Sequence, residues 1–289
     1  MYYALIILSV VVFGGNFALN DVYRKMRGST LRVALESSVL GGIAGLMALL
    51  LLNLMDLSFA CTPFTLIMSL ICAASGFCFT FFSFKALDHV NLSLYAVFSM
   101  LGGMLLPFLL GIGFFGEGIT LAKVICVLLI AVALAMTVSF KEKKRGLLYC
   151  IGIFFFNGMS GVLSKLFTEL PFEKTSAFGY SFYSAAFSIV IGAVLYLVLF
   201  AKKNSDMPYT WKALIVCAAK GASNRIANYI LVIALAHVAA SVQYPMVTGG
   251  TMIVSTLLCY LGDRRPSRRE LCSVAVAFLS MLALFVIPI

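Results

Sequence analysis

The chain has 289 residues, of which 62% are hydrophobic and only 11% are charged, and its formal net charge is +10. Apolar runs of about 20 residues recur from end to end, which excludes a soluble domain and predicts an all-α integral membrane protein. The Lys and Arg residues fall in short connections between these runs, so we expect them to face anionic membrane lipids and not nucleic acid.

The eight cysteines lie mostly inside apolar runs, without a C-x-x-C pair or a Cys/His cluster. We expect them to behave as small buried hydrophobic residues, so the pattern predicts no disulfide framework, no metal site and no cofactor. The N-terminal run 1–20 has no basic leader and no convincing cleavage site, and we interpret it as a first span and not as a signal peptide.

Ten transmembrane spans are predicted in chain order, at about 2–23, 30–54, 63–86, 91–115, 120–139, 146–168, 176–201, 209–236, 240–262 and 268–287. The basic segment 141–145 divides them into two halves of five spans, 1–140 and 146–289. The connections after odd-numbered spans hold most of the Lys and Arg residues, whereas the opposite side holds only Lys123, Lys165 and Lys174. The positive-inside rule therefore predicts a multi-pass protein of a bacterial inner or plasma membrane, with both termini outside the cytoplasm.

The two halves resemble each other in sequence. The segment Ala86–Val90 (ALDHV) returns as Ala234–Val238 (ALAHV), and matches in the same register pair Ser93 with Ser241 and Gly102 with Gly250. At the front of each half, Phe13 matches Phe156 and Gly15 matches Gly158. Such a series indicates an internal repeat of about 145 residues. Because each repeat has an odd number of spans, the halves must be inverted, as in many secondary transporters that bind substrate near the membrane midplane.

Three short motifs add a family resemblance: Phe13–Phe17 (FGGNF), Gly116–Thr120 (GEGIT) and the weaker echo Gly262–Asp263 (GD). Together with the ten spans and the duplication, the whole chain resembles the EamA-like transporters of the drug/metabolite transporter superfamily. The resemblance implies ten helices in two five-helix repeats and transport of a small metabolite or drug, with export favoured. The second half departs from the pattern, since Asp263-Arg264-Arg265 stands where the first half has Glu117-Gly118-Ile119.

The eighth span carries the strongest candidate site. Lys220, Asn224 and Asn228 follow one another at i, i+4 and i+8, and Arg225 precedes Asn228 by three residues. A buried charge costs on the order of 2.5–3.5 kcal/mol at the bilayer centre, so we expect this basic stripe to face a polar cavity and bind substrate. Internal pairing that only fixes helix packing stays open as the alternative.

Glu36 in the second span has two interpretations. It lies four residues after Arg32, so the two side chains can pair on one helix face. Alternatively, Glu36 faces the cavity and binds a substrate amine, or binds Arg225 when substrate is absent.

Other spans add polar candidates that line a cavity or merely bridge helices. These substrate-site candidates are Asn16 and Asn20 beside Asp21, Asn157 with Ser160 and Ser164, Tyr95, Tyr180, Tyr183, Gln243 and Tyr244. Lys165 is expected to extend toward the membrane surface from the end of its span and is discounted. Pro107 is the favoured hinge, and a structural role is favoured over proton coupling for His89 and His237.

These features predict a secondary active transporter of a small polar metabolite, either an amino-acid-like zwitterion or an organic anion. A proton or counter-substrate is the expected coupling partner, since the chain has no nucleotide-binding motif. We expect a monomer or a homodimer. One alternative is an exporter of organic cations that uses Glu36, with Lys220 and Arg225 structural. A membrane-embedded lipid enzyme is a remote alternative, because the sequence offers no catalytic constellation, and the chain is not expected to be an enzyme.

Overall fold

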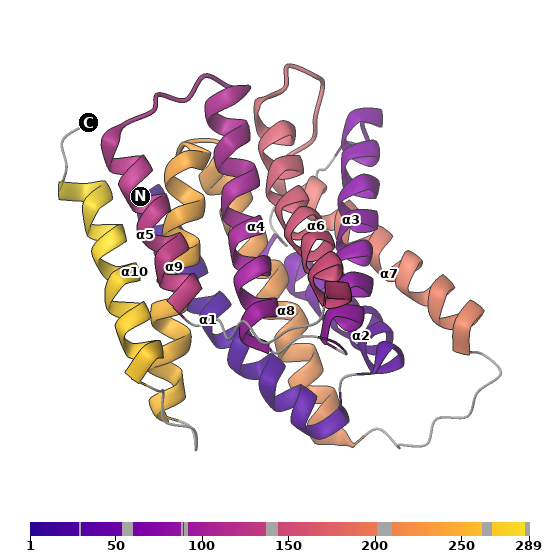
Figure 1. The fold of residues 1–289 in the computed structure, drawn as a ribbon. Coiled ribbons are helices and arrows are strands. Elements are labelled where there is room, and N and C mark those ends of the chain that lie inside the picture. The colour runs from indigo at the N-terminus through magenta and orange to yellow at the C-terminus, as the bar shows by residue number, and fades with distance from the viewer. Residues whose placement is uncertain are drawn as a thin grey trace.

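The computed structural model describes residues 1–28, 30–53, 60–87, 89, 92–136, 144–200, 210–261 and 268–286. All regular structure in these residues is helical, which confirms the predicted all-α fold class (Figure 1). The ten helices are α1 (Tyr2–Arg27), α2 (Leu31–Leu52), α3 (Pro63–Leu87), α4 (Leu92–Gly113), α5 (Leu121–Met136), α6 (Lys144–Glu169), α7 (Ala177–Phe200), α8 (Trp211–Leu235), α9 (Ala240–Leu261) and α10 (Arg268–Val286).

Each helix coincides with a predicted span to within a few residues, and side-chain caps fix two of the starts. The hydroxyl of Thr30 accepts a hydrogen bond from the backbone N–H of Val33 at the start of α2. The hydroxyl of Thr210 does the same for Ala213 at the start of α8. Such caps satisfy N–H groups that have no partner inside the helix. The motif Gly262–Asp263 lies outside the described residues.

Five of the described helices are long and apolar enough to cross a membrane by length and composition. They are α1, α2, α7 and the segments Pro63–Ser83 of α3 and Gly146–Glu169 of α6. Shorter apolar stretches lie at Phe98–Gly113, Leu121–Met136 and Leu271–Ser280. Helix α8 is as long as these five, at 25 residues, but it carries two cations and two asparagines near its middle. The described helices therefore support a multi-pass membrane protein.

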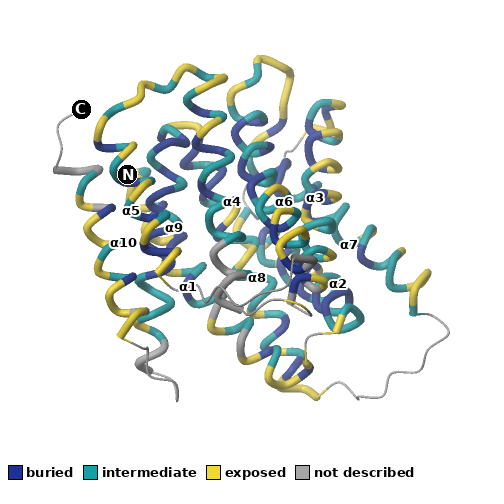
Figure 2. Tube along the Cα trace, viewed as in Figure 1, coloured by how far each residue is buried: buried dark blue, intermediate teal, exposed yellow. Residues whose placement is uncertain are grey.

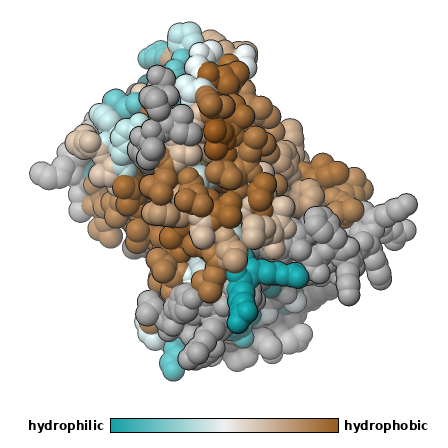
Figure 3. All heavy atoms as spheres, turned by 60° about the vertical axis from the view of Figure 1, so that its left-hand side comes forward, coloured by the Kyte–Doolittle hydropathy of each residue, from teal (hydrophilic) through white to brown (hydrophobic). Residues whose placement is uncertain are grey.

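Apolar side chains cover much of the outer surface. On α5, Leu128 and Val132 are 60% and 52% exposed, and on α10 Phe278 and Leu279 are 52% and 57% exposed. Figure 3 shows this face as a broad hydrophobic area with hydrophilic residues gathered toward its two ends. A patch of this extent is unfavourable in water but suits the hydrocarbon core of a bilayer. The buried residues lie instead toward the middle of the bundle, where α4, α6, α8 and α9 meet (Figure 2).

Contacts between helices follow a regular pattern. Helix α1 packs on α8 and α9, and α6, five helices later, packs on α3 and α4. Helix α2 also contacts α7, α4 contacts α9 and α5 contacts α10. In each of these pairs the second helix is the one five positions after the first, so the two members are equivalent helices of the two halves. The two histidines make equivalent contacts in the two halves. His237 stacks on Tyr2 of α1 at 3.8 Å between ring centroids, and His89 stacks on Tyr149 of α6 at 5.7 Å.

Glycines allow the backbones of several helices to touch. A Cβ atom added to Gly221 of α8 would collide with the backbone of Gly41 in α2, and one added to Gly45 would lie 2.5 Å from Cγ of Arg225. A Cβ added to Gly102 of α4 would collide with the backbone of Phe154 in α6. Close packing of this kind is the main source of helix association in lipid, where no hydrophobic force draws helices together. It also places Arg225 directly against α2.

Candidate functional site

The polar side chains of α8 do not form the single stripe that their spacing suggested. Residues 220 and 225 are five positions apart, which is a rotation of about 140° between their side chains at about 100° per residue. Lys220 is directed to α1 and α2, where its Nζ donates to the hydroxyl of Ser37 at 3.0 Å and lies 5.2 Å from the ring centroid of Tyr23. Arg225 is directed instead to Gly45 of α2 and to groups on α3 and α7.

Arg225 is the most unusual charge in the bundle. Its aliphatic stem crosses Gly45, and Cys72 of α3 and Tyr180 of α7 are the ionisable side chains in its surroundings. Among the described residues, no carboxylate pairs with this guanidinium and no side chain hydrogen-bonds to it. A cation inside an apolar bundle is costly unless a partner or a ligand compensates it. The arrangement therefore favours an anionic ligand at Arg225.

Tyr180 provides a second group without a partner beside this cation. Its side chain is 3% exposed, and its hydroxyl makes no hydrogen bond of good geometry within the described structure, although the Cys72 thiol and the Ser164 hydroxyl lie near it. The ring stacks on Phe167 of α6 at 4.4 Å, and the hydroxyl of Ser69 in α3 donates to the Tyr180 carbonyl at 3.2 Å. These contacts hold the phenol in place. Because buried hydroxyls are normally hydrogen-bonded, a fixed hydroxyl without a partner is suited to bind a ligand.

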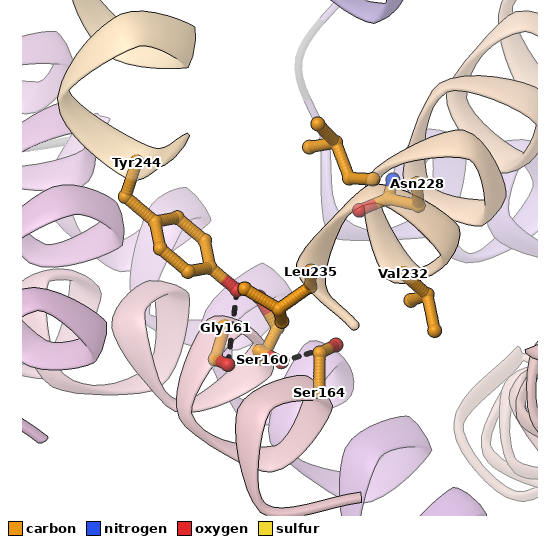
Figure 4. Close-up of a pocket in the computed structure, with 8 residues that line it drawn as sticks. Ser160, Gly161, Ser164, Asn228, Val232, Leu235 and Tyr244 are labelled. Carbon is orange, nitrogen blue, oxygen red and sulfur yellow. Dashed lines mark hydrogen bonds between the residues drawn. The ribbon is translucent and has the colours of Figure 1, made fainter. Parts of the chain in front are cut away.

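A small cavity of about 40 Å³, partly open to the outside, lies between α6, α8 and α9. Figure 4 shows Tyr244 on one wall and Asn228 and Val232 on the other, with the serines of α6 between them. The lining is half polar and half apolar: Ser160, Gly161, Ser164, Asn228, Leu231, Val232, Leu235 and Tyr244. This composition is typical of a small-molecule site, in which a few polar groups orient an otherwise apolar ligand.

The polar side chains of the cavity are held by bonds to helix carbonyls. The Tyr244 hydroxyl donates to the Gly161 carbonyl at 3.0 Å, and the Ser164 hydroxyl donates to the Ser160 carbonyl at 2.9 Å (Figure 4). The Asn228 amide donates to the Asn224 carbonyl at 2.7 Å. Both asparagines are exposed, and Asn228 lines the cavity. The oxygen lone pairs of the serines remain available to a ligand, since each hydroxyl uses only its proton in these bonds.

Val232 connects the cavity to Arg225 and Tyr180. It lines the cavity and packs in one apolar cluster with Tyr180, Phe167 and Leu163. Val232 follows Arg225 by seven residues, which is about two turns along the same face of α8. The unpaired guanidinium and the phenol therefore lie at one end of the α8 face whose other end forms the cavity wall.

Pro107 of α4 lies next to the same cavity. It is fully buried inside α4, and a Cβ added to Gly161 would lie 2.6 Å from its ring and 2.9 Å from the ring of Tyr244. The absence of a side chain at Gly161 thus allows α4, α6 and α9 to approach one another next to the cavity. A proline inside α4 removes a helix hydrogen bond at this point, so the helix is easier to bend here.

Glu36 follows the simpler of its two interpretations. Its carboxylate accepts from Arg27 at 2.8 Å and from Arg32 at 3.2 Å, and the Tyr196 hydroxyl lies 3.3 Å away. The predicted pairing with Arg225 is not present. Two cations therefore hold Glu36 near the ends of α1 and α2, away from the cavity residues.

The expectation that Lys165 extends to the membrane surface is wrong. The residue is 3% exposed, and its Nζ lies 2.9 Å from Oε1 of Glu117 and 2.8 Å from Oε1 of Glu169. The Glu117 carboxylate also accepts the backbone N–H groups of Ala240 and Ser241, both at 2.9 Å, and thereby caps α9. Site prediction missed Glu117, although its GEGIT motif had been identified as a family signal.

Two opposing effects act on the pKa of Glu117. Burial alone would raise the pKa of the carboxyl, but the hydrogen bonds from Ser241, Lys165 and Ala240 outweigh it and hold the pKa below its ordinary value. These donors stabilise the charged form of the carboxylate. Glu117 is therefore a charged helix cap at neutral pH.

Other predicted site residues act between helices. Asn16 donates to the Lys220 carbonyl and to the Ser223 hydroxyl, and Asn157 donates to the Ser99 carbonyl. Gln243 is fully buried, and its amide donates to the Leu231 carbonyl of α8. The structure therefore assigns these three amides to helix bridging, which was the alternative reading for them.

The remaining candidates lie in different surroundings. Tyr95 packs against the apolar cluster around Met104 and Ile153, and Tyr183 interacts with Cys61 just before α3. Neither residue lines the cavity, whereas Tyr244 does. Asn20 is partly buried, one turn after Asn16 on α1.

Comparison with known proteins shows the fold alone. No family model and no curated protein matches the chain. Twenty-nine chains of solved structures are similar to it. One, described only as "Crystal structure of protein", has a TM-score of 0.78 and 14% identity, and the match covers 99% of each chain. The whole arrangement of helices thus recurs in a protein of very different sequence.

Proposed function

We propose that this protein is a secondary active carrier that moves small organic anions across a membrane by alternating access. The observation that carries the proposal is the guanidinium of Arg225, which has no carboxylate partner among the described residues and lies beside the buried Tyr180 hydroxyl. A charge kept in this position costs stability, so a functional role in ligand binding is the simplest reason for it.

The proposed architecture is ten transmembrane spans in two inverted repeats, 1–140 and 146–289, as in the EamA-like transporters. Support comes from the helix contacts, which map onto themselves when each helix is exchanged for the one five positions later. Helix α8 is long enough to span, at about 1.5 Å per residue over 25 residues, and its two central cations, Lys220 and Arg225, face other helices. The excess of Lys and Arg in one set of connections places that side in the cytoplasm and both termini outside it.

In this proposal the cavity between α6, α8 and α9 is part of the substrate route, near the centre of the bundle. Alternating access requires that the helices lining such a site move relative to one another. The contacts of Tyr244 and Pro107 with Gly161 lie where α4, α6 and α9 meet, so we assign the hinge to this point. Glu117 and Lys165 fasten α9 to the end of α6 on one side of it.

Transport of organic cations through Glu36 is less well supported. Arg27 and Arg32 already neutralise that carboxylate, and a cationic drug would have to displace them. Two cations, Lys220 and Arg225, lie on the central helix without a described carboxylate partner, and they would repel a cationic substrate.

A counterflow assay tests the proposal. Purified protein is reconstituted into lipid vesicles preloaded with an unlabelled organic acid, and uptake of the same labelled acid is measured for a panel of monocarboxylates, dicarboxylates and sugar phosphates. We expect saturable uptake above that of empty vesicles for at least one acid. Arg225→Gln should abolish it, while Lys212→Gln, at an exposed cation in the first turn of α8, should not. Uptake confined to organic cations, and unchanged in Arg225→Gln, would contradict the proposal.

A further inference from the structure

We infer that the site at Arg225 selects carboxylic acids that lack an ammonium group, so that a 2-hydroxy acid with an apolar side chain is bound in preference to the matching amino acid. This inference rests on the proposed carrier function and narrows its substrate class.

The anion-binding half of the site is present. The guanidinium of Arg225 offers several N–H donors in one plane, which match the two oxygens of a carboxylate. The Tyr180 hydroxyl is buried in the same region, near the Ser164 hydroxyl, and makes no hydrogen bond of good geometry in the described structure. Phe167 holds its ring in place, so a carboxylate at Arg225 finds a preorganised second donor.

The ammonium-binding half is missing from the described side chains. Glu36 forms ion pairs with Arg27 and Arg32. Glu117 forms an ion pair with Lys165 and accepts two N–H groups of α9. Glu169 also pairs with Lys165. Glu173 is exposed, between α6 and α7. None of these four carboxylates is available to neutralise an ammonium group at the cavity.

An amino acid in this cavity would therefore bring a buried cation toward another, Arg225. Neutral oxygens of Ser160, Ser164 or Asn228 can accept its N–H bonds but cannot cancel its charge. A hydroxyl at the same carbon atom makes the same bonds without that charge. The site as described thus has no charged group that compensates the desolvation of an ammonium.

The cavity walls indicate what the rest of the ligand is like. Leu231, Val232 and Leu235 of α8 form the apolar part of the cavity wall, and α6 adds hydroxyl groups. Figure 4 labels Val232 and Leu235. A branched aliphatic or aromatic side chain packs well on such a wall. A second carboxylate at the far end of the ligand would instead contact these apolar side chains, which is unfavourable. The geometry points to monocarboxylates with an apolar body.

Matched ligands that differ in one group test this inference. The probes are 2-hydroxy-4-methylpentanoate, leucine and 3-methylbutylamine, which share a branched side chain but carry hydroxyl plus carboxylate, ammonium plus carboxylate, and ammonium alone. The melting temperature of the purified protein is measured against the concentration of each, because a ligand of the folded state raises it. We expect the hydroxy acid to bind at least about 10-fold more tightly than leucine, the difference that one unpaired polar group typically makes.

Variants connect the effect to the proposed residues. Arg225→Gln should remove stabilisation by the hydroxy acid, and Tyr180→Phe, which removes only the hydroxyl, should weaken it by roughly 3- to 10-fold. Lys212→Gln serves as the control and should leave it unchanged. If Arg225→Gln does not fold, the Tyr180→Phe result decides.

The outcomes separate this inference from the carrier function. Leucine binding as tightly as the hydroxy acid, or more tightly, overturns the inference, while counterflow of either compound leaves the carrier intact. Equal binding of the hydroxy acid by the wild type and by both the Arg225 and Tyr180 variants also overturns it. Binding of the amine alone, with no counterflow of any acid, overturns the inference and the carrier of organic anions together.

Discussion

The Nζ atom of Lys165 lies 2.9 Å from Oε1 of Glu117, and this pair joins the end of α6 to the connection that precedes α5. The same carboxylate caps α9 through two backbone N–H groups. In Figure 1 the α4–α5 and α6–α7 connections lie at the same end of the bundle. One carboxylate therefore fastens three helix ends together on one side of the cavity.

Removing the charge of Glu117 is expected to destabilise the protein. In Glu117→Gln, Lys165 stays buried with Glu169 as its sole carboxylate, and α9 loses a charged cap. Loss of a buried partner predicts a cost on the order of 2–3 kcal/mol. Thermal unfolding in detergent measures it. The matched control is Glu169→Gln, whose side chain is 39% exposed, and which should change stability by less than about 1 kcal/mol. Equal effects of both variants would contradict the role given to Glu117.

The depressed pKa of Glu117 predicts how this stability depends on pH. A carboxyl whose pKa is lower in the folded than in the unfolded state stabilises the fold above its ordinary value of 4.5 and loses that contribution as pH falls through the folded-state pKa. Stability attributable to Glu117 should thus be constant from pH 7 to about 5 and decline below about 4.5. Melting temperatures of the wild type and Glu117→Gln should converge in that acidic range. A gap that persists at low pH would show that the charge is not responsible.

Substitution of Glu36 tests whether its carboxylate has a structural role or binds substrate. In Glu36→Gln the buried Arg27 and the nearby Arg32 lose their shared acceptor, so we expect a marked loss of thermal stability. Binding of organic acids should be unchanged, because Glu36 does not line the cavity. If the variant keeps its stability but its affinity for organic amines changes, Glu36 binds substrate and the structural role is wrong.

The close approach of α2 and α8 can be tested with two glycines. Gly221→Ala places a methyl group against the backbone of Gly41, so the helices must separate and Arg225 must move; we expect destabilisation and loss of acid binding. Gly76→Ala in α3 is the control, since an added Cβ there meets nothing within 4 Å. It should be neutral or should stabilise by up to about 1 kcal/mol, as alanine favours a helix over glycine. A neutral Gly221→Ala would contradict the packing described for α8.

The helices could be predicted from the sequence because each apolar run of about 20 residues is a local signal, and the ten helices begin and end close to the predicted spans. Glu117 and Lys165 carry no such signal, since α5, two connections and most of α6 separate them in the chain. Lys165 lies near a helix end, where a lone span would let it reach water, but in the bundle the end of α6 is enclosed by neighbouring helices.

Sequence spacing was also a weak guide to direction within the site. Lys220 and Arg225 are close in sequence but face different helices, because five residues turn a helix by more than one full revolution. Tyr95 and Gln243 occupy equivalent positions in the two halves, yet one packs in an apolar cluster and the other bridges α8 and α9. Tyr180 stood out only once its hydroxyl was seen to be buried without a partner.

Equilibrium binding of a labelled 2-hydroxy acid to the purified protein tests most directly whether Arg225 holds an organic anion. The wild type and Lys212→Gln should each bind about one molecule per chain at saturation, and Arg225→Gln should bind none at the same concentration. Unchanged binding by Arg225→Gln would show that the anion lies elsewhere and that the guanidinium has a structural role alone.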